Sequence, residues 1–130
     1  MPPIQFSRDT DRGFAGVALT FARVPMALTP GDLAGADVAV LGAPFDLAVT
    51  YRPGTRFGPR AVRQAEDVGV DRRPSIELGL DPYAELSVVD YGDAAAPASD
   101  VLAAHASIQE RVAEILSAGA LPVVIGGDHS

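Results

Sequence analysis

The sequence predicts an α/β domain, a three-layer, doubly wound parallel sheet of which this chain forms the N-terminal part. Three short apolar runs, rich in Val and ended by Gly or Asp, have the continuous hydrophobicity of strands that are covered on both faces. Two stretches with helical spacing of apolar residues lie between them, so the elements alternate in the order β-α-β-α-β. That alternation is typical of a parallel sheet with helices on both faces.

The predicted strands cover residues 37–42, 86–90 and 121–126. The first helix opens at Gly58 and Pro59, because proline fits the first turn of a helix. Ala61, Val62 and Ala65 follow at helical spacing, and we expect them to form its buried face.

The second helix has clearer boundaries. We expect Ser99 to cap its first turn, Asp100 to complement the positive helix end and Gly119 to terminate it. Its apolar stripe consists of Val101, Ala104, His105, Ile108, Val112 and Ile115.

The 130 residues are predicted to form a single partial domain, with an N-terminal arm over about residues 1–30 and a β-α-β-α-β core over about residues 36–130. Because the chain stops directly after the third strand, we expect it to be the first part of a longer domain. The arm carries Phe14, Val17, Leu19 and Phe21 ahead of the first strand. We expect these side chains to bury against a neighbouring subunit.

Composition disfavours several classes of protein. Seventeen acidic residues against ten basic residues give a net charge of −7, which disfavours nucleic-acid binding. The absence of Cys excludes disulfide scaffolds, zinc-thiolate sites and thiol catalysis. No apolar run is long enough for a membrane span, and no cleavage site follows the apolar stretch at residues 14–22, so a cytoplasmic location is expected.

Chemistry-bearing residues follow each predicted strand, at residues 42–46, 90–93 and 126–130. In open α/β sheets, ligands bind beyond the carboxyl ends of the strands, so these segments should meet at one edge. A nucleotide-binding module is disfavoured at the first segment, because it lacks spaced glycines and Pro44 has no N–H for a phosphate.

The last of these segments carries the most specific signal. Gly126 and Gly127 would let the backbone turn sharply and approach a ligand, and His129 follows beside Asp128. A neutral imidazole there suits a divalent metal ion, and Asp128 could orient it or a neighbour. A turn with a hydrogen-bonded His is the alternative. A Ser-His-Asp triad is disfavoured, because adjacent residues in an extended segment point to opposite faces, so Asp128, His129 and Ser130 should not relay to one another.

The same segment, residues 126–130, resembles the first metal motif of the ureohydrolases, the arginase and agmatinase family. Residues 42–46, 52–59, 61–63 and 90–93 are similar to further motifs of that family, in the same order. The arm, at residues 14–16 and 20–25, resembles agmatinase-like and guanidinobutyrase-like members. The resemblance implies an arginase-like fold.

The resemblance also implies that His129 is a ligand of a two-manganese centre, whose bridging hydroxide attacks the guanidinium carbon and releases urea. The family's other ligands lie in an Asp-x-His-x-Asp segment and an Asp-x-Asp segment, and neither occurs in these residues. Agmatine is the favoured substrate, with guanidinobutyrate or another guanidino acid as the alternative. A non-catalytic fragment or pseudoenzyme that serves as an assembly or binding module is a third hypothesis. The family further implies a homo-oligomer, a trimer or hexamer.

Several other residues have competing interpretations. His105 is predicted to pack rather than to bind a metal, and Asp90 and Asp93 to fix loops through backbone hydrogen bonds. Arginines near the first helix could clamp a carboxylate, but structural anchoring or subunit contact is favoured; these are Arg52, Arg56, Arg60 and Arg63. Candidates for the rim of an active site are Asp46, Tyr51, Arg52 and Phe57. Gly126, Gly127, Asp128 and Ser130 are candidates for shaping the loop around His129.

Overall fold

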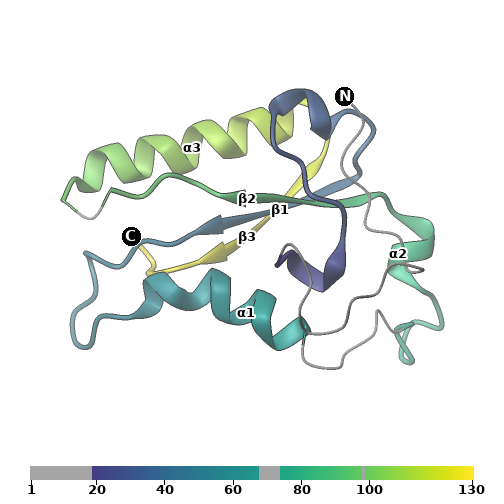
Figure 1. Cartoon of the computed structure of the whole chain (residues 1–130), viewed down its shortest axis with the longest axis horizontal. Coiled ribbons are helices and arrows are strands. Elements are labelled where there is room, and N and C mark those ends of the chain that lie inside the picture. Colours follow the sequence, from purple (N-terminus) through teal and green to yellow (C-terminus); the bar gives the residue numbers. More distant parts are fainter. Residues whose placement is uncertain (1–18, 68–73, 98) are drawn as a thin grey trace.

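The computed structural model describes residues 19–67, 74–97 and 99–130, and it contains a parallel sheet between two layers of helix. The strands are β1 (Val38–Ala43), β2 (Val88–Asp93) and β3 (Leu121–Gly126), in the spatial order β2-β1-β3. Helix α1 (Gly58–Asp67) covers one face and α3 (Val101–Ser117) the other (Figure 1). The predicted three-layer α/β fold is therefore confirmed.

The shorter elements lie ahead of β1 and in the connections that follow it. They are the 3-10 turns η3 (Phe21–Arg23), η4 (Pro30–Leu33) and η5 (Thr55–Phe57), and the single turn α2 (Pro82–Glu85). None of the helices within the described ranges is long and apolar enough to cross a bilayer.

Strand register brings the carboxyl ends together. β1 and β3 pair without interruption from Val38 opposite Leu121 to Ala43 opposite Gly126. The β1–β2 pairing shifts between Val40 and Gly42, which places Gly42 opposite Asp93. Within the described residues nothing pairs with the outer edge of β3, and its Leu121 side chain is 62% exposed.

The predicted stripe of α3 faces the sheet. Ala104 and Ile115 are fully buried, and Ile108 and Val112 are partly buried, whereas Val101 at the helix start is exposed. The expected cap was wrong by one residue. Asp100 rather than Ser99 caps the helix, because the Asp100 carboxylate accepts the Ala103 N–H at 2.9 Å.

The buried face of α1 differs from the prediction. Ala61, Val62 and Ala65 are exposed, and the helix instead buries Pro59 and Arg63. Arg63 can lie inside because its guanidinium pairs with the buried carboxylate of Asp90 on β2, at 2.8 Å. The prediction was wrong because it considered apolar side chains alone. The helix turns the face that carries Arg63 toward the sheet, since the buried carboxylate of Asp90 needs a cation as its partner.

The described end of the N-terminal arm packs on its own chain. Met26 forms a parallel bridge with Asp90, and the Ala27 N–H donates to the Asp90 carbonyl at 2.8 Å. Ala22 and Val24 are buried there. Of the apolar side chains predicted to bury against a neighbouring subunit, Leu19 is exposed and Phe21 is partly buried within this chain. Phe14 and Val17 lie outside the described residues, so the contact with a neighbouring subunit stays a prediction.

Candidate functional site

The segment that follows β3 is held against the segment that follows β1. The Gly127 N–H donates to the Ala43 carbonyl at 3.2 Å, and the Asp128 N–H donates to the Phe45 carbonyl at 2.8 Å. The strand pairing thus continues past the end of the sheet. Two of the three segments predicted to meet at this edge are joined directly by hydrogen bonds.

Gly127 is required by this contact. A Cβ atom on Gly127 would overlap the Phe45 carbonyl oxygen and lie 2.6 Å from the Ala43 carbonyl oxygen. A Cβ on Gly126 would meet nothing closer than the Asp128 carbonyl oxygen at 3.8 Å. Neither glycine has a positive φ. The chain bends at residues 127–128, as expected, and Gly127 allows the backbone that follows β1 to approach closely. A close approach to a ligand stays a prediction.

Asp128 organises the residues that follow it. Its Oδ1 accepts the Ser130 N–H at 3.0 Å and the Ser130 hydroxyl at 2.6 Å, which is an Asx turn. Its Oδ2 accepts the Ala48 N–H at 2.9 Å. The hydrogen bond from the Ser130 side chain, together with those from the Ser130 and Ala48 backbones, lowers the pKa of Asp128. The carboxylate is therefore ionised at neutral pH, and both of its oxygens accept hydrogen bonds from Ser130 or Ala48.

These contacts correct part of the expectation about a triad. Asp128 and Ser130 do interact, because residues two apart in a turn lie on the same side. Ser130 also contacts a histidine, since its hydroxyl lies 2.9 Å from His105 Nε2. Ser130, however, stands between Asp128 and His105, whereas a triad needs the imidazole between the hydroxyl and the carboxylate. The arrangement is not a catalytic triad.

His129 lies between Asp128 and Ser130 and is exposed on the lining of an open pocket of about 680 Å³. Its imidazole forms no hydrogen bond or ion pair with any residue in the part of the chain that the structure describes. Both ring nitrogens are thus accessible, which suits a single metal ligand. Across residues 19–67, 74–97 and 99–130, no group of three or more His, Cys, Asp or Glu side chains could hold a metal ion. Within the described residues, His129 is therefore a single candidate ligand without others grouped around it.

His105 also lines this pocket. Its ring packs edge-on against Phe45, with the centroids 5.4 Å apart and the planes at 70°. The predicted packing role is seen in this contact. The hydrogen bond to Ser130 was missed, because sequence spacing does not show which loop lies opposite a helix position.

Asp46 is buried, and it closes the loop that follows β1. Its carboxylate accepts the Gly54 N–H at 2.6 Å and the Arg56 Nε–H at 2.6 Å. The Arg56 guanidinium, with backbone donors from Gly54 and Arg56, outweighs the effect of burial and lowers the pKa of Asp46 to about 2. Asp46 and Arg56 are therefore ionised partners that fix the loop.

The other rim candidates lie on the exposed part of this loop. Tyr51 is 82% exposed and stacks with the Arg52 guanidinium, whose central carbon lies 5.2 Å from the ring centroid. Phe57 is also exposed. None of these side chains is among the described residues that line the pocket. A role for them at an entrance stays a prediction.

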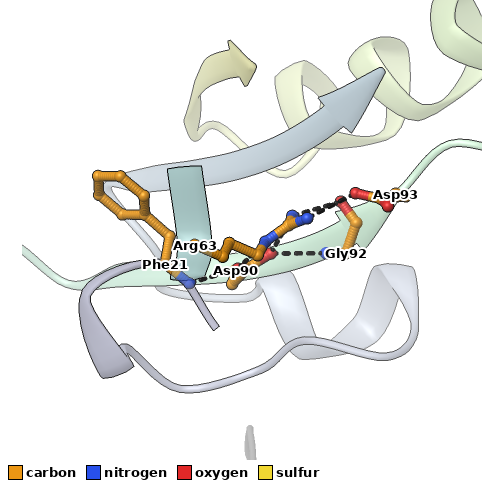
Figure 2. Close-up of polar contacts among 5 residues, drawn as sticks. All are labelled: Phe21, Arg63, Asp90, Gly92 and Asp93. Atoms are coloured by element: carbon orange, nitrogen blue, oxygen red, sulfur yellow. Dashed lines mark hydrogen bonds and ion pairs between the residues drawn. The ribbon is translucent and has the colours of Figure 1, made fainter. Parts of the chain in front are cut away.

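A buried ion pair joins α1 to β2. Asp90 is fully buried, and its two oxygens accept Arg63 Nε at 2.8 Å and Nη2 at 2.9 Å (Figure 2). The Phe21 N–H and the Gly92 N–H also donate to this carboxylate, at 2.7 and 2.9 Å. Arg63 Nη1 reaches Asp93 at 2.6 Å. The predicted backbone hydrogen bonds of Asp90 are present, and Arg63 is the partner that the sequence interpretation missed.

The electrostatics of Arg63 follow from this geometry. Burial lowers the pKa of the guanidinium, but the hydrogen bonds and charges of Asp90 and Asp93 outweigh burial, and the net pKa is raised. Arg56 and Arg63 thus pair with carboxylates of the same chain and anchor its structure. This agrees with the favoured interpretation of these two arginines. One signal could have identified the pair: a carboxylate within an apolar strand needs a buried cation.

The sequence of this chain is similar to those of known proteins. Residues 36–130 match the model of the Arginase family. The chain is 46% identical over 98 residues to an agmatinase of Chromobacterium violaceum, covering 75% of this chain and 30% of that protein. It is 39% identical over 117 residues to a guanidinobutyrase of Pseudomonas aeruginosa, covering 90% of this chain and 36% of that protein.

A solved structure shows the same arrangement. The crystal structure of a hypothetical agmatinase from Burkholderia thailandensis superposes with a TM-score of 0.77 at 40% identity, covering 89% of this chain and 35% of that one. The chain thus spans about a third of the length of these relatives. The sheet order, the match over residues 36–130 and the identities agree: the chain belongs to the arginase family.

Proposed function

We propose that the complete gene product carrying this chain is a metal-dependent hydrolase that releases urea from a linear guanidino compound. The observation that carries the proposal is the accessible imidazole of His129, held at the carboxyl end of β3 beside a pocket, in a chain of the arginase family. Agmatinase and guanidinobutyrase are names of its relatives, and both name enzymes for guanidino substrates. A non-catalytic module is the competing proposal.

In this proposal His129 holds one ion of a two-manganese site, and the remaining ligands come from residues outside this chain. Two bound Mn²⁺ ions would supply water made nucleophilic at neutral pH. Asp128 serves by holding the turn, since its oxygens are already occupied by Ser130 and Ala48. An imidazole ligand suits Mn²⁺, which also accepts carboxylates.

Agmatine is the favoured substrate. The net charge of −7 favours a cation over an anion through the long-range field of the chain, and agmatine carries two positive groups. Guanidinobutyrate or another guanidino acid is the alternative, which the name of the Pseudomonas aeruginosa relative supports.

The test measures urea release by the purified complete gene product. The protein is stripped of metal with a chelator, then supplied with Mn²⁺, Mg²⁺ or Ca²⁺ and offered agmatine, guanidinobutyrate or arginine. We expect urea from agmatine with Mn²⁺ and none from the stripped protein. Faster release from guanidinobutyrate would select the guanidino acid, and no urea under any condition would favour the non-catalytic module.

We also propose a homo-oligomer, a trimer or hexamer, as the assembly. Exposed aromatic side chains support it, because Tyr51 and Phe57 are 82% and 64% exposed on the surface of this chain. Light scattering should give the mass of an oligomer, and a monomer at micromolar concentration would contradict the proposal.

A further inference from the structure

His105 connects α3 to the turn that carries His129. It lies among the apolar positions of the helix, yet its Nε2 is 2.9 Å from the Ser130 hydroxyl. Its ring also packs edge-on against Phe45, in the segment that follows β1. One side chain of α3 thus contacts both segments that meet at the carboxyl edge of the sheet.

The direction of the hydrogen bond can be assigned by counting protons. Ser130 has one hydroxyl proton, and the hydroxyl donates it to Asp128 Oδ1 at 2.6 Å. The Ser130 oxygen can therefore only accept from His105, so Nε2 of His105 carries a proton and donates it. A hydrophobic replacement of His105 would leave the Ser130 oxygen without this donor.

The turn is consequently fixed on both sides of His129. On one side, Asp128 is bound to the segment after β1 through the Phe45 carbonyl and the Ala48 N–H. On the other side, Ser130 is bound to α3 through His105. The exposed imidazole between them has no partner of its own among the described residues, so its position depends on these two anchors.

We propose that His105 is a positioning residue for His129, which rests on the proposed role of His129 as a metal ligand. A ligand held in place before the ion arrives loses less conformational freedom on binding. Changes in the residues that orient metal ligands typically reduce metal affinity 10- to 100-fold. His105 acts through Ser130, and we therefore expect a loss near the lower end, about tenfold.

The experiment titrates Mn²⁺ into the metal-stripped complete gene product and follows binding by calorimetry. His105→Leu removes the donor and keeps apolar bulk, whereas in His105→Gln the side-chain amide can still donate. Val112→Ala is the matched control, because Val112 lies on the same face of α3 and packs against the core away from the pocket. Amide hydrogen exchange of residues 128–130, measured without metal, reports opening of the turn.

We expect His105→Leu to weaken Mn²⁺ binding about tenfold and to speed exchange at Ser130. His105→Gln should restore most of both, and Val112→Ala should change neither. Should His105→Leu fail to fold, His105→Met carries the same expectation, because it also removes the donor, keeps apolar bulk and leaves the hydrogen bond between Ser130 and Asp128 intact.

Three results would overturn the inference. They are unchanged affinity in His105→Leu or its substitute, an equal loss in Val112→Ala, and no rescue by His105→Gln. His129→Asn separates this inference from the proposed function. If His129→Asn weakens binding and His105→Leu does not, only the positioning role fails. If the wild type takes up no Mn²⁺, or His129→Asn has no effect, both fail.

Discussion

Replacing Arg63 with Met should destabilise the protein by about 3 kcal/mol. The substitution keeps most of the aliphatic stem and removes the guanidinium from a fully buried carboxylate. Breaking a buried ion pair by removing one partner typically costs about 3–5 kcal/mol, because a charge is left uncompensated. Asp90 would keep its hydrogen bonds from the Phe21 and Gly92 N–H groups, which places the expected cost at the lower end.

The assay is urea denaturation of the complete gene product at one protein concentration. The control is Arg60→Met on the same helix, where the side chain is exposed and the change should stay within about 0.5 kcal/mol. In an Asp90→Asn background the cost of Arg63→Met should fall, with a coupling energy of about 1–3 kcal/mol. Equal effects of Arg63→Met and Arg60→Met would refute the reasoning that the Arg63–Asp90 pair supports the fold.

Two further predictions concern the segments at the carboxyl edge. Gly127→Ala should lower the free energy of unfolding, measured by urea denaturation, by about 1–3 kcal/mol, because the new Cβ meets backbone atoms that cannot move aside. Gly126→Ala is the control and should stay within about 1 kcal/mol of wild type. Equal losses in the two variants would contradict the close approach of the backbone at Gly127. Folding lowers the pKa of Asp46 from 3.8 to about 2. The ionised carboxylate therefore contributes its full stabilisation above the pKa of the unfolded state, and this contribution is lost as the pH falls through the pKa of the folded state. The difference in unfolding free energy between wild type and Asp46→Asn should therefore shrink from about pH 4 to about pH 2, and a constant difference would contradict the pairing with Arg56.

Strand positions and layer order followed from the sequence because they depend on local patterns. Continuous apolar runs predicted all three strands, with the first and third within one residue of their ends and the second starting two residues early and ending three residues early. The alternation with helices predicted the parallel sheet. The buried face of α1 did not follow. The partner of Arg63 is Asp90, 27 residues further along the chain, and no local pattern records that pairing.

The sequence predicted which edge of the sheet carries the candidate site, but not the contacts between its residues. Parallel strands end at one edge, so the segments that follow β1 and β3 had to meet. The backbone contact of Gly127 was missed because Ala43 and Phe45 lie far from it in the sequence. The contact between His105 and Ser130 joins residues 25 apart, and it depends on how α3 lies across the sheet.

The measurement closest to the central claim is the manganese content of His129→Asn in the complete gene product. Elemental analysis after dialysis at limiting Mn²⁺ gives the number of ions per subunit, and urea release from agmatine gives turnover. Loss of one imidazole ligand should reduce binding at one of two ion positions and cut turnover severely, with the unfolding free energy changed by no more than about 1–2 kcal/mol. His129→Asn that retains two ions per subunit and full turnover would contradict the assignment of His129 as a metal ligand and leave it a residue of the turn.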